Sequence, residues 1–188
     1  MSGLINHIPA ALAGALLLAR FDTAGIKYFE PTLEGFWRSF WAAGLVGPLF
    51  LLLLIIKYIQ SNGFALVHHI AIESLAYVIA WVLFPLVMAG LTQQFDCTKN
   101  YILFIISYNW CSAIQNGVYL PIAILGYAGM LSSGIANLLA LLAITWVVVY
   151  TFFIVHTVLK VSRITAFGIV VLDLILGLLL DTATNKFV

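Results

Sequence analysis

Long apolar stretches separated by short polar ones form the dominant pattern of this chain. A bilayer core about 30 Å thick needs roughly 20 apolar residues of helix to cross it. Five stretches approach or exceed this length, and each ends at charged or turn-forming residues. They are residues 39–56, 70–91, 101–125, 135–159 and 164–180. Because backbone groups in hydrocarbon must be hydrogen-bonded within the protein, this pattern predicts an all-α integral membrane protein, a bundle of five transmembrane helices.

Residues 1–38 carry a different pattern. Their apolar run, residues 8–19, extends only about 18 Å as a helix, which is too short to cross the bilayer. Apolar residues recur in this region at helical spacing, namely Ile5, Ile8, Leu12, Ala15, Leu16 and Ala19. We therefore expect an amphipathic segment in the cytoplasmic interface, followed by a five-helix domain over residues 39–188. A sixth span is the alternative.

An aromatic cluster follows the chain breaks at Gly25 and Pro31. Its members are Phe36, Trp37, Phe40 and Trp41. Helical spacing is expected to place them on one side of a helix, and aromatic rings are enriched at the level of the lipid headgroups. The sequence therefore predicts an interfacial anchor at the start of the first span.

Basic residues are distributed unequally between the two predicted sides of the membrane. The side of the amino terminus holds Arg20, Lys27, Arg38, Lys99, Lys160 and Arg163, and the other side holds Lys57 and Lys186. Because positive residues accumulate on the cytoplasmic side, we expect a cytoplasmic amino terminus and a periplasmic carboxyl terminus. Short connections and the lack of targeting signals favour a bacterial inner membrane.

Composition supports a membrane location and excludes one class of partner. Apolar residues make up 64% of the chain and charged residues 8%, against roughly 45 to 50% and 25% in soluble domains. The formal charge is +1 without a basic run that could bind phosphate backbones, so nucleic acid is excluded as a partner. Cys97 falls in a predicted loop and Cys111 in a span, and we expect two free thiols.

Motifs of catalysis and cofactor binding are missing from the sequence. It contains no nucleotide-binding loop, His-Glu-x-x-His metal motif or Ser-centred nucleophile elbow. His69 and Glu73 stand at i and i+4 beside His68, a spacing that could supply metal ligands. No third ligand of suitable type follows nearby, which favours a solvated helix end. The sequence thus predicts no metal, no cofactor and no enzymatic activity.

A group of polar residues inside the predicted spans forms the candidate functional cluster. Its members are Asp173, Asn109, Ser112, Asn116, Gln115 and Glu73. An ionisable residue in hydrocarbon costs about 2.5 to 3.5 kcal/mol on insertion, so each one needs a reason. Asp173 and Asn109 are expected at similar depths of about 13 and 12 Å. We therefore predict that Asp173 is hydrogen-bonded to a polar group of another helix, with Asn109 as the leading candidate.

Two interpretations of this polar cluster are open. In the first, the side chains hydrogen-bond between helices and fix the packing, each bond contributing about 0.6 to 2 kcal/mol. In the second, they form a polar track from Glu73 to Asp173 that carries protons or binds a small solute. The absence of a buried Lys or Arg beside the acids favours the first. A polar, hydrated cavity joining Glu73 to Asp173 would favour the second.

The chain also resembles a known family in its general plan. A cytoplasmic amphipathic segment leads through residues 31–37, Pro-Thr-Leu-Glu-Gly-Phe-Trp, into the five spans. This layout resembles the Yip membrane family, five-pass proteins named for their interaction with Rab-type GTPases, and especially its bacterial relatives. The resemblance implies an external carboxyl terminus. The Asp-Leu-Tyr-Gly-Pro signature of many eukaryotic members is absent, so the resemblance implies no functional residue.

Two functions follow as hypotheses. The first is a non-enzymatic multi-pass membrane scaffold or accessory protein, which the family resemblance, the thin loops and the missing catalytic motifs favour. Its partners would be the lipid bilayer and other membrane proteins or further copies of the chain. The alternative is a small-solute or proton-linked transporter or channel that uses Asp173, Asn109 and Glu73.

Overall fold

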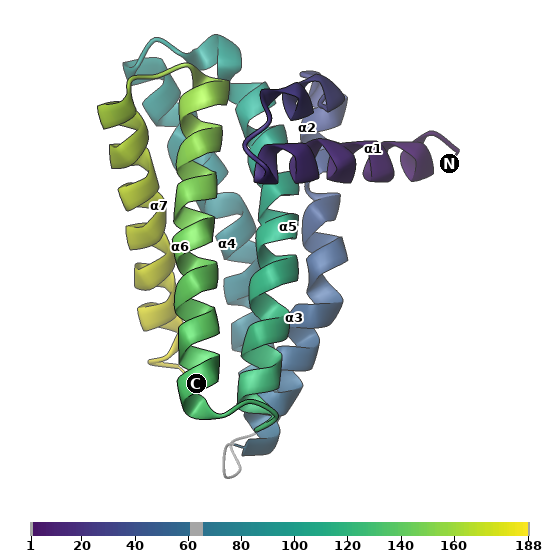
Figure 1. Ribbon diagram of the computed structural model, residues 1–188, viewed down its shortest axis with the longest axis vertical. Coiled ribbons are helices and arrows are strands. Elements are labelled where there is room, and N and C mark those ends of the chain that lie inside the picture. Colours follow the sequence, from purple (N-terminus) through teal and green to yellow (C-terminus); the bar gives the residue numbers. More distant parts are fainter. Residues whose placement is uncertain (1, 61–65, 188) are drawn as a thin grey trace.

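The chain folds into helices joined by short connections (Figure 1). The computed structural model describes residues 2–60 and 66–187, with side chains placed for residues 7–60 and 67–187. The elements are α1 (Ser2–Ala19), the 3₁₀ helix η1 (Thr23–Tyr28), α2 (Leu33–Ser39), α3 (Trp41–Gln60), α4 (Leu66–Gln94), the 3₁₀ helix η2 (Thr98–Asn100), α5 (Tyr101–Tyr127), α6 (Ser133–Leu159) and α7 (Arg163–Thr184). These residues include no strand, which confirms the all-α fold class.

Several of the helices are long and apolar enough to cross a bilayer. These segments are Leu33–Gln60, Val67–Gln94, Ser133–Leu159 and Arg163–Thr184, so the first of them joins α2 and α3. Their length and composition indicate a helical membrane protein. α5 is equally long, but it carries polar residues through its middle and is not among these segments.

α5 lies at the centre of the bundle. It packs most extensively against α6 and α3, and it also contacts α1 and α2. Its middle is buried on most sides, and the buried residues include the polar Asn109 and Gln115. Because neighbouring helices surround α5, these polar side chains face protein instead of hydrocarbon. This position explains how the least apolar of the long helices is accommodated.

α4 and α7 form the opposite side of the bundle. They pack against each other, and α7 also packs against α6, whereas α4 contacts α3 and α5 less extensively. Figure 1 shows α4 behind α5 and α6, with α7 at the edge of the bundle. The looser contact of α4 leaves space between these two helices and the polar face of α5.

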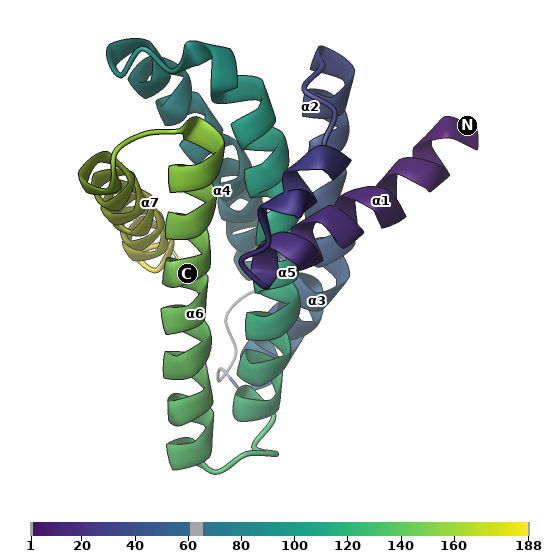
Figure 2. The same cartoon turned by 45° about the horizontal axis from the view of Figure 1, so that its top comes forward.

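α1 lies across the bundle, whereas the long helices run along it (Figures 1 and 2). Its docking face is formed by Ala11, Gly14, Ala15 and Leu18, all of which are buried. The Tyr150 hydroxyl of α6 donates a hydrogen bond of 2.6 Å to the carbonyl oxygen of Ala15. α1 is thereby fixed against the long helices.

The predicted apolar stripe of α1 coincides only in part with this docking face. Ala15 is fully buried, but Leu16 is 50% exposed and Leu12 is half-buried. The side chain of Ile5 lies outside the described residues. α1 is apolar on nearly all sides, so spacing alone could not identify the contact face. Small residues form it because they let two backbones approach closely.

Two glycines bring α1 and η1 into backbone contact. A Cβ atom on Gly25 would lie 2.3 Å from the carbonyl oxygen of Gly14, and one on Gly14 would lie 2.7 Å from Cβ of Tyr28. The Asp22 carboxylate begins η1 by accepting a hydrogen bond of 2.8 Å from the backbone N–H of Ala24. The chain therefore turns back along α1 at a distance that only glycine permits.

The aromatic cluster does not form the one-sided anchor that was predicted. Trp37 and Trp41 are 70% and 57% exposed, whereas Phe36 and Phe40 are half-buried. The Phe36 ring lies 6.2 Å from the ring of Tyr101 at the start of α5. The cluster consists of two pairs at i and i+4, rotated about 100° from each other around the helix. One pair therefore faces outward and the other faces the bundle.

The contact between the two glycines can be tested by substitution. Gly25→Ala should destabilise the protein by about 1 to 3 kcal/mol, because the added methyl group meets backbone that cannot move aside. Gly44→Ala is the matched control, since a Cβ atom there would lie 3.7 Å from the Trp41 ring, an ordinary contact. Thermal unfolding of the detergent-solubilised protein measures the stability of both variants. Equal stabilities of the two variants would contradict the close backbone contact between α1 and η1.

Candidate functional site

A pocket of about 450 Å³ with both polar and apolar lining lies between α3, α4, α5 and α7. It occupies the space that the loose packing of α4 leaves beside α5. Each of the four helices contributes one face to its wall, so no single stretch of sequence contains the site. Of the predicted cluster, Glu73, Ser112 and Asn116 line this pocket.

The α5 wall of the pocket is a regular polar face. Tyr108, Ser112, Asn116 and Tyr119 recur at i, i+4, i+8 and i+11, which places them on one side of the helix. The Asn116 amide donates a hydrogen bond of 2.9 Å to the carbonyl oxygen of Ser112. Asn109 of the predicted cluster is absent from this face, because Tyr108 occupies it instead.

The α4 wall combines one carboxylate with aromatic rings. Its lining residues are Glu73, Ala76, Tyr77, Ala80 and Trp81. The Tyr77 hydroxyl donates a hydrogen bond of 2.6 Å to the carbonyl oxygen of Ala43. The Tyr77 ring stacks on Phe50 of α3, with ring centroids 4.4 Å apart. Within the described residues the Glu73 carboxylate has no hydrogen-bond or ion-pair partner.

The outer part of the pocket is charged. Lys57, Tyr127, Asp181 and Thr184, from the last turns of α3, α5 and α7, belong to its lining. These helices end at the same end of the bundle (Figure 1). The Lys57 ammonium lies 5.4 Å from the centre of the Tyr127 ring. The pocket therefore reaches the end of the bundle that is opposite α1 and α2.

Asp173 lies just beyond the inner end of the pocket. The Tyr108 hydroxyl, which lines the pocket, donates a hydrogen bond of 2.9 Å to the Asp173 carboxylate. Asp173 stands one turn before the lining residue Gly177 on α7. The Phe84 ring of α4 packs beside the Tyr108 ring, with ring centroids 4.5 Å apart. One side chain therefore separates the carboxylate from the pocket.

The predicted hydrogen bond between Asp173 and another helix is confirmed, but its partner is Tyr108 and not the leading candidate Asn109. The Asn109 amide is fully buried and donates a hydrogen bond of 2.8 Å to the Ser39 hydroxyl of α2. Its carbonyl oxygen has no partner within the described residues. The depth estimate was adequate, but one residue further along a helix turns a side chain by about 100°. Asn109 therefore faces α2, and its neighbour Tyr108 meets Asp173.

Gln115 also lies outside the pocket. Its amide donates a hydrogen bond of 3.0 Å to the Thr151 hydroxyl of α6, and both residues are buried. The pocket residues that sequence reasoning did not select include Lys57, Tyr77, Tyr108 and Asp181. The helical spacing of Tyr108, Ser112 and Asn116 could have indicated that Tyr108 shares their face. Lys57, Tyr77 and Asp181 reach the pocket only through tertiary packing.

The histidines at the start of α4 show no ligand geometry. A ring nitrogen of His68 lies 3.0 Å from the carbonyl oxygen of Phe187. The His69 ring is buried near Tyr58, and its Nε2 atom has no hydrogen-bond partner in the described part of the chain. Among the same residues, no three His, Cys, Asp or Glu side chains lie close enough to hold a metal ion.

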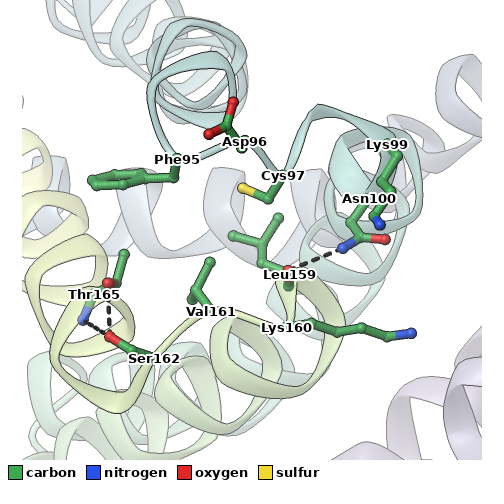
Figure 3. A pocket seen from close by; sticks show the side chains of 10 residues that line it. All are labelled: Phe95, Asp96, Cys97, Lys99, Asn100, Leu159, Lys160, Val161, Ser162 and Thr165. Atoms are coloured by element: carbon green, nitrogen blue, oxygen red, sulfur yellow. Dashed lines mark hydrogen bonds between the residues drawn. The ribbon is translucent and has the colours of Figure 1, made fainter.

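A second pocket, of about 310 Å³, lies at the other end of the bundle (Figure 3). It is formed where the connections before α5 and before α7 meet. The Asn100 amide donates a hydrogen bond of 3.0 Å to the carbonyl oxygen of Leu159, and Ser162 caps α7. Burial, with a further effect of the Asp96 carboxylate, raises the pKa of the Cys97 thiol. These polar groups join two loops, which is a structural role.

No family model, no curated protein and no solved structure matches this chain. The chemistry of the first pocket follows from its lining, which offers carboxylates, one ammonium group, hydroxyl and amide groups and aromatic faces. Such a combination of apolar walls with a few placed polar groups is typical of small-molecule binding sites, whose volumes are about 300 to 1,000 Å³. Non-covalent binding is the chemistry that these groups support.

The interaction energy between Tyr108 and Asp173, at the inner end of the pocket, can be measured by a double-mutant cycle. Tyr108→Phe and Asp173→Leu should each lower the stability by about 0.6 to 2 kcal/mol, because each removes the same interhelical hydrogen bond. The double variant should lose less than the sum of the two. Asp173→Asn retains an acceptor oxygen and should stay close to the original stability.

Tyr119→Phe is the matched control for this cycle. It removes a hydroxyl on the same helix that makes no hydrogen bond within the described residues, and it should leave the stability nearly unchanged. Unfolding in mixed micelles provides the measurement. Strictly additive effects of Tyr108→Phe and Asp173→Leu would show that the two residues do not interact.

Proposed function

We propose that this protein is a five-pass membrane protein that binds a small solute in the pocket between α3, α4, α5 and α7, as a transporter or channel. The observation that carries the proposal is the pocket itself, which extends from the charged end of the bundle to the Tyr108–Asp173 contact. Polar and ionisable residues within membranes are costly and mark solute or proton paths. A structural role for the cluster would not require space among its members.

The inner end of the pocket suggests how passage would be controlled. Tyr108 is held between Asp173 and the Phe84 ring, so a path toward the other side of the membrane must break the Tyr108–Asp173 hydrogen bond. A proton or a solute that binds Asp173 would compete with this bond. In the proposed mechanism, the carboxylate therefore couples occupancy of the pocket to opening of its closed end.

A scaffold or accessory role is the second candidate, and it is supported by the outer surfaces of α4 and α7. Only 11% of the apolar window in α4 and 17% of that in α7 are buried. The exposed side chains of α4 include Leu75, Val78 and Leu86. Lipid, another membrane protein or a second copy would cover these faces. The general resemblance to the Yip family also favours this scaffold or accessory role.

The proposed topology places α5 across the membrane with the amino terminus in the cytoplasm of a bacterium. α5 runs the length of the bundle between the end of α4 and the start of α6 (Figure 1). The neighbours that bury its polar residues remove the need for an apolar surface. The basic residues Lys99, Lys160 and Arg163 lie in or beside the connections at the α1 end, which supports a cytoplasmic location for that end.

Reporter cysteines can test this topology in a background without Cys97 and Cys111. Lys186→Cys should react with a membrane-impermeant maleimide in spheroplasts, and Lys99→Cys should react only after permeabilisation. If α5 did not cross the membrane, the two positions would lie on the same side. Labelling of both reporters from one side would therefore overturn the five-span proposal.

Water access to the pocket tests the proposed function itself. In the same cysteine-free background, Asn116→Cys should react with a charged, impermeant maleimide applied from the side of the carboxyl terminus, because a hydrated pocket permits thiolate formation. Val118→Cys is the matched control on the same helix. Val118 is 41% exposed on the outer surface and does not line the pocket, so lipid should protect it.

A second substitution links this labelling to the pocket. A Cβ atom on Gly177 would meet no atom within 4 Å, so Gly177→Leu should fill the pocket without a clash and suppress the labelling of Asn116→Cys. Gly168→Leu places the same side chain at an open position of α7 outside the pocket and should not suppress it. An unreactive Asn116→Cys would mean a dry bundle and would refute the solute-binding proposal.

A further inference from the structure

The chemistry of the pocket lining restricts the class of solute. We infer that the pocket accepts an organic cation, an ammonium or related group attached to an apolar body. This inference rests on the proposed function, because it names the solute of the same pocket. Three features of the pocket support it: the charges of its lining, the aromatic rings of its lining and its open volume.

Charge is the first argument. The described lining contains two carboxylates, from Glu73 and Asp181, and one ammonium group, from Lys57. Asp173 adds a third carboxyl group behind Tyr108. The Glu73 carboxylate has no partner among the described residues, so a bound cation would supply its missing counter-charge. An anion would meet two carboxylates and only one ammonium group.

Aromatic faces are the second argument. The lining includes Phe50, Tyr77, Trp81, Tyr108, Tyr119 and Tyr127. Tyr77 stacks on Phe50 and meets Trp81 edge to face, with centroids 6.1 Å apart. The faces of such rings attract cations within about 6 Å of their centres. They also provide the apolar surface that an alkyl or aryl body needs.

The outer part of the pocket already shows this mode of recognition. The Lys57 ammonium lies 5.4 Å from the centre of the Tyr127 ring, so an ammonium group of the protein itself occupies one aromatic face. Deeper in the pocket, Tyr77 and Trp81 stand one and two turns beyond Glu73 on α4. A second ammonium group can therefore lie between a carboxylate and aromatic rings.

Space for the apolar body is the third argument. The pocket volume of about 450 Å³ lies within the usual range for small-molecule sites. Ala76, Ala80 and Gly177 contribute small side chains to the wall, and a Cβ atom on Gly177 would meet nothing within 4 Å. The lining thus leaves room beside its charged and aromatic groups.

A binding experiment with matched probes tests the inference. The full-length protein in nanodiscs of neutral phosphatidylcholine is titrated with benzyltrimethylammonium or with benzenesulfonate, aromatic ions of similar size and opposite charge. Calorimetry reports binding, and a change in tryptophan fluorescence, to which Trp81 of the lining contributes, supports it. We expect the cation to bind and the anion not to bind. Glu73→Gln should weaken cation binding about tenfold, because it removes the counter-charge but keeps the shape.

Two glycine variants locate the bound probe. Gly177→Leu should abolish cation binding, whereas Gly168→Leu should bind the cation as the original protein does. Cation binding that neither Glu73→Gln nor Gly177→Leu affects would place the probe elsewhere and overturn the inference. Benzenesulfonate binding that Gly177→Leu abolishes would overturn the cation class and leave the solute-binding function intact.

Failure of the inference and failure of the proposed function give different results. If neither probe binds while Asn116→Cys is labelled by the impermeant maleimide, the pocket is hydrated and the inferred solute class is wrong. If neither probe binds and Asn116→Cys is also unreactive, both the solute-binding function and the inferred cation class are refuted.

Discussion

Burial of the polar middle of α5 inside the helix bundle is the constraint on which the rest of the structure depends. α5 carries Asn109, Gln115 and Asn116 in its middle, and each would cost several kcal/mol if it faced hydrocarbon. The bundle meets this requirement by surrounding α5 with α3, α6, α1 and α2. Asn109 and Gln115 are then hydrogen-bonded to Ser39 and Thr151 of the surrounding helices.

The pocket lies on the remaining side of α5. There α4 and α7 pack against each other and contact Tyr108, but they leave space beside Ser112 and Asn116. A close-packed bundle would have filled this face with side chains from α4 and α7. Instead, those helices contribute Ala76, Ala80 and Gly177 next to Glu73 and Asp181. Small residues beside charged ones therefore line the space between α4, α5 and α7.

The amino-terminal helices stabilise the closed end of the same bundle. α1 is fixed to α6 by the hydrogen bond from Tyr150 to Ala15, and α2 supplies Ser39 to Asn109 of α5. The pocket opens toward the opposite end. The two ends of the molecule therefore differ: one holds α1 and α2, and the pocket beside α5 opens toward the other, which holds Lys57 and Asp181.

The sequence by itself determined where each helix lies along the bundle axis, because charged residues and turns mark the ends of apolar runs. It therefore indicated that Asp173 and the middle of α5 share a depth, and that Glu73, Ser112 and Asn116 belong to one polar region. Only the tertiary structure decided how each helix is rotated about its own axis. Rotation depends on contacts between residues far apart in the chain, and a shift of one residue turns a side chain by about 100°. Hence Tyr108, and not Asn109, meets Asp173, and only packing brings Lys57 and Asp181 to the same pocket.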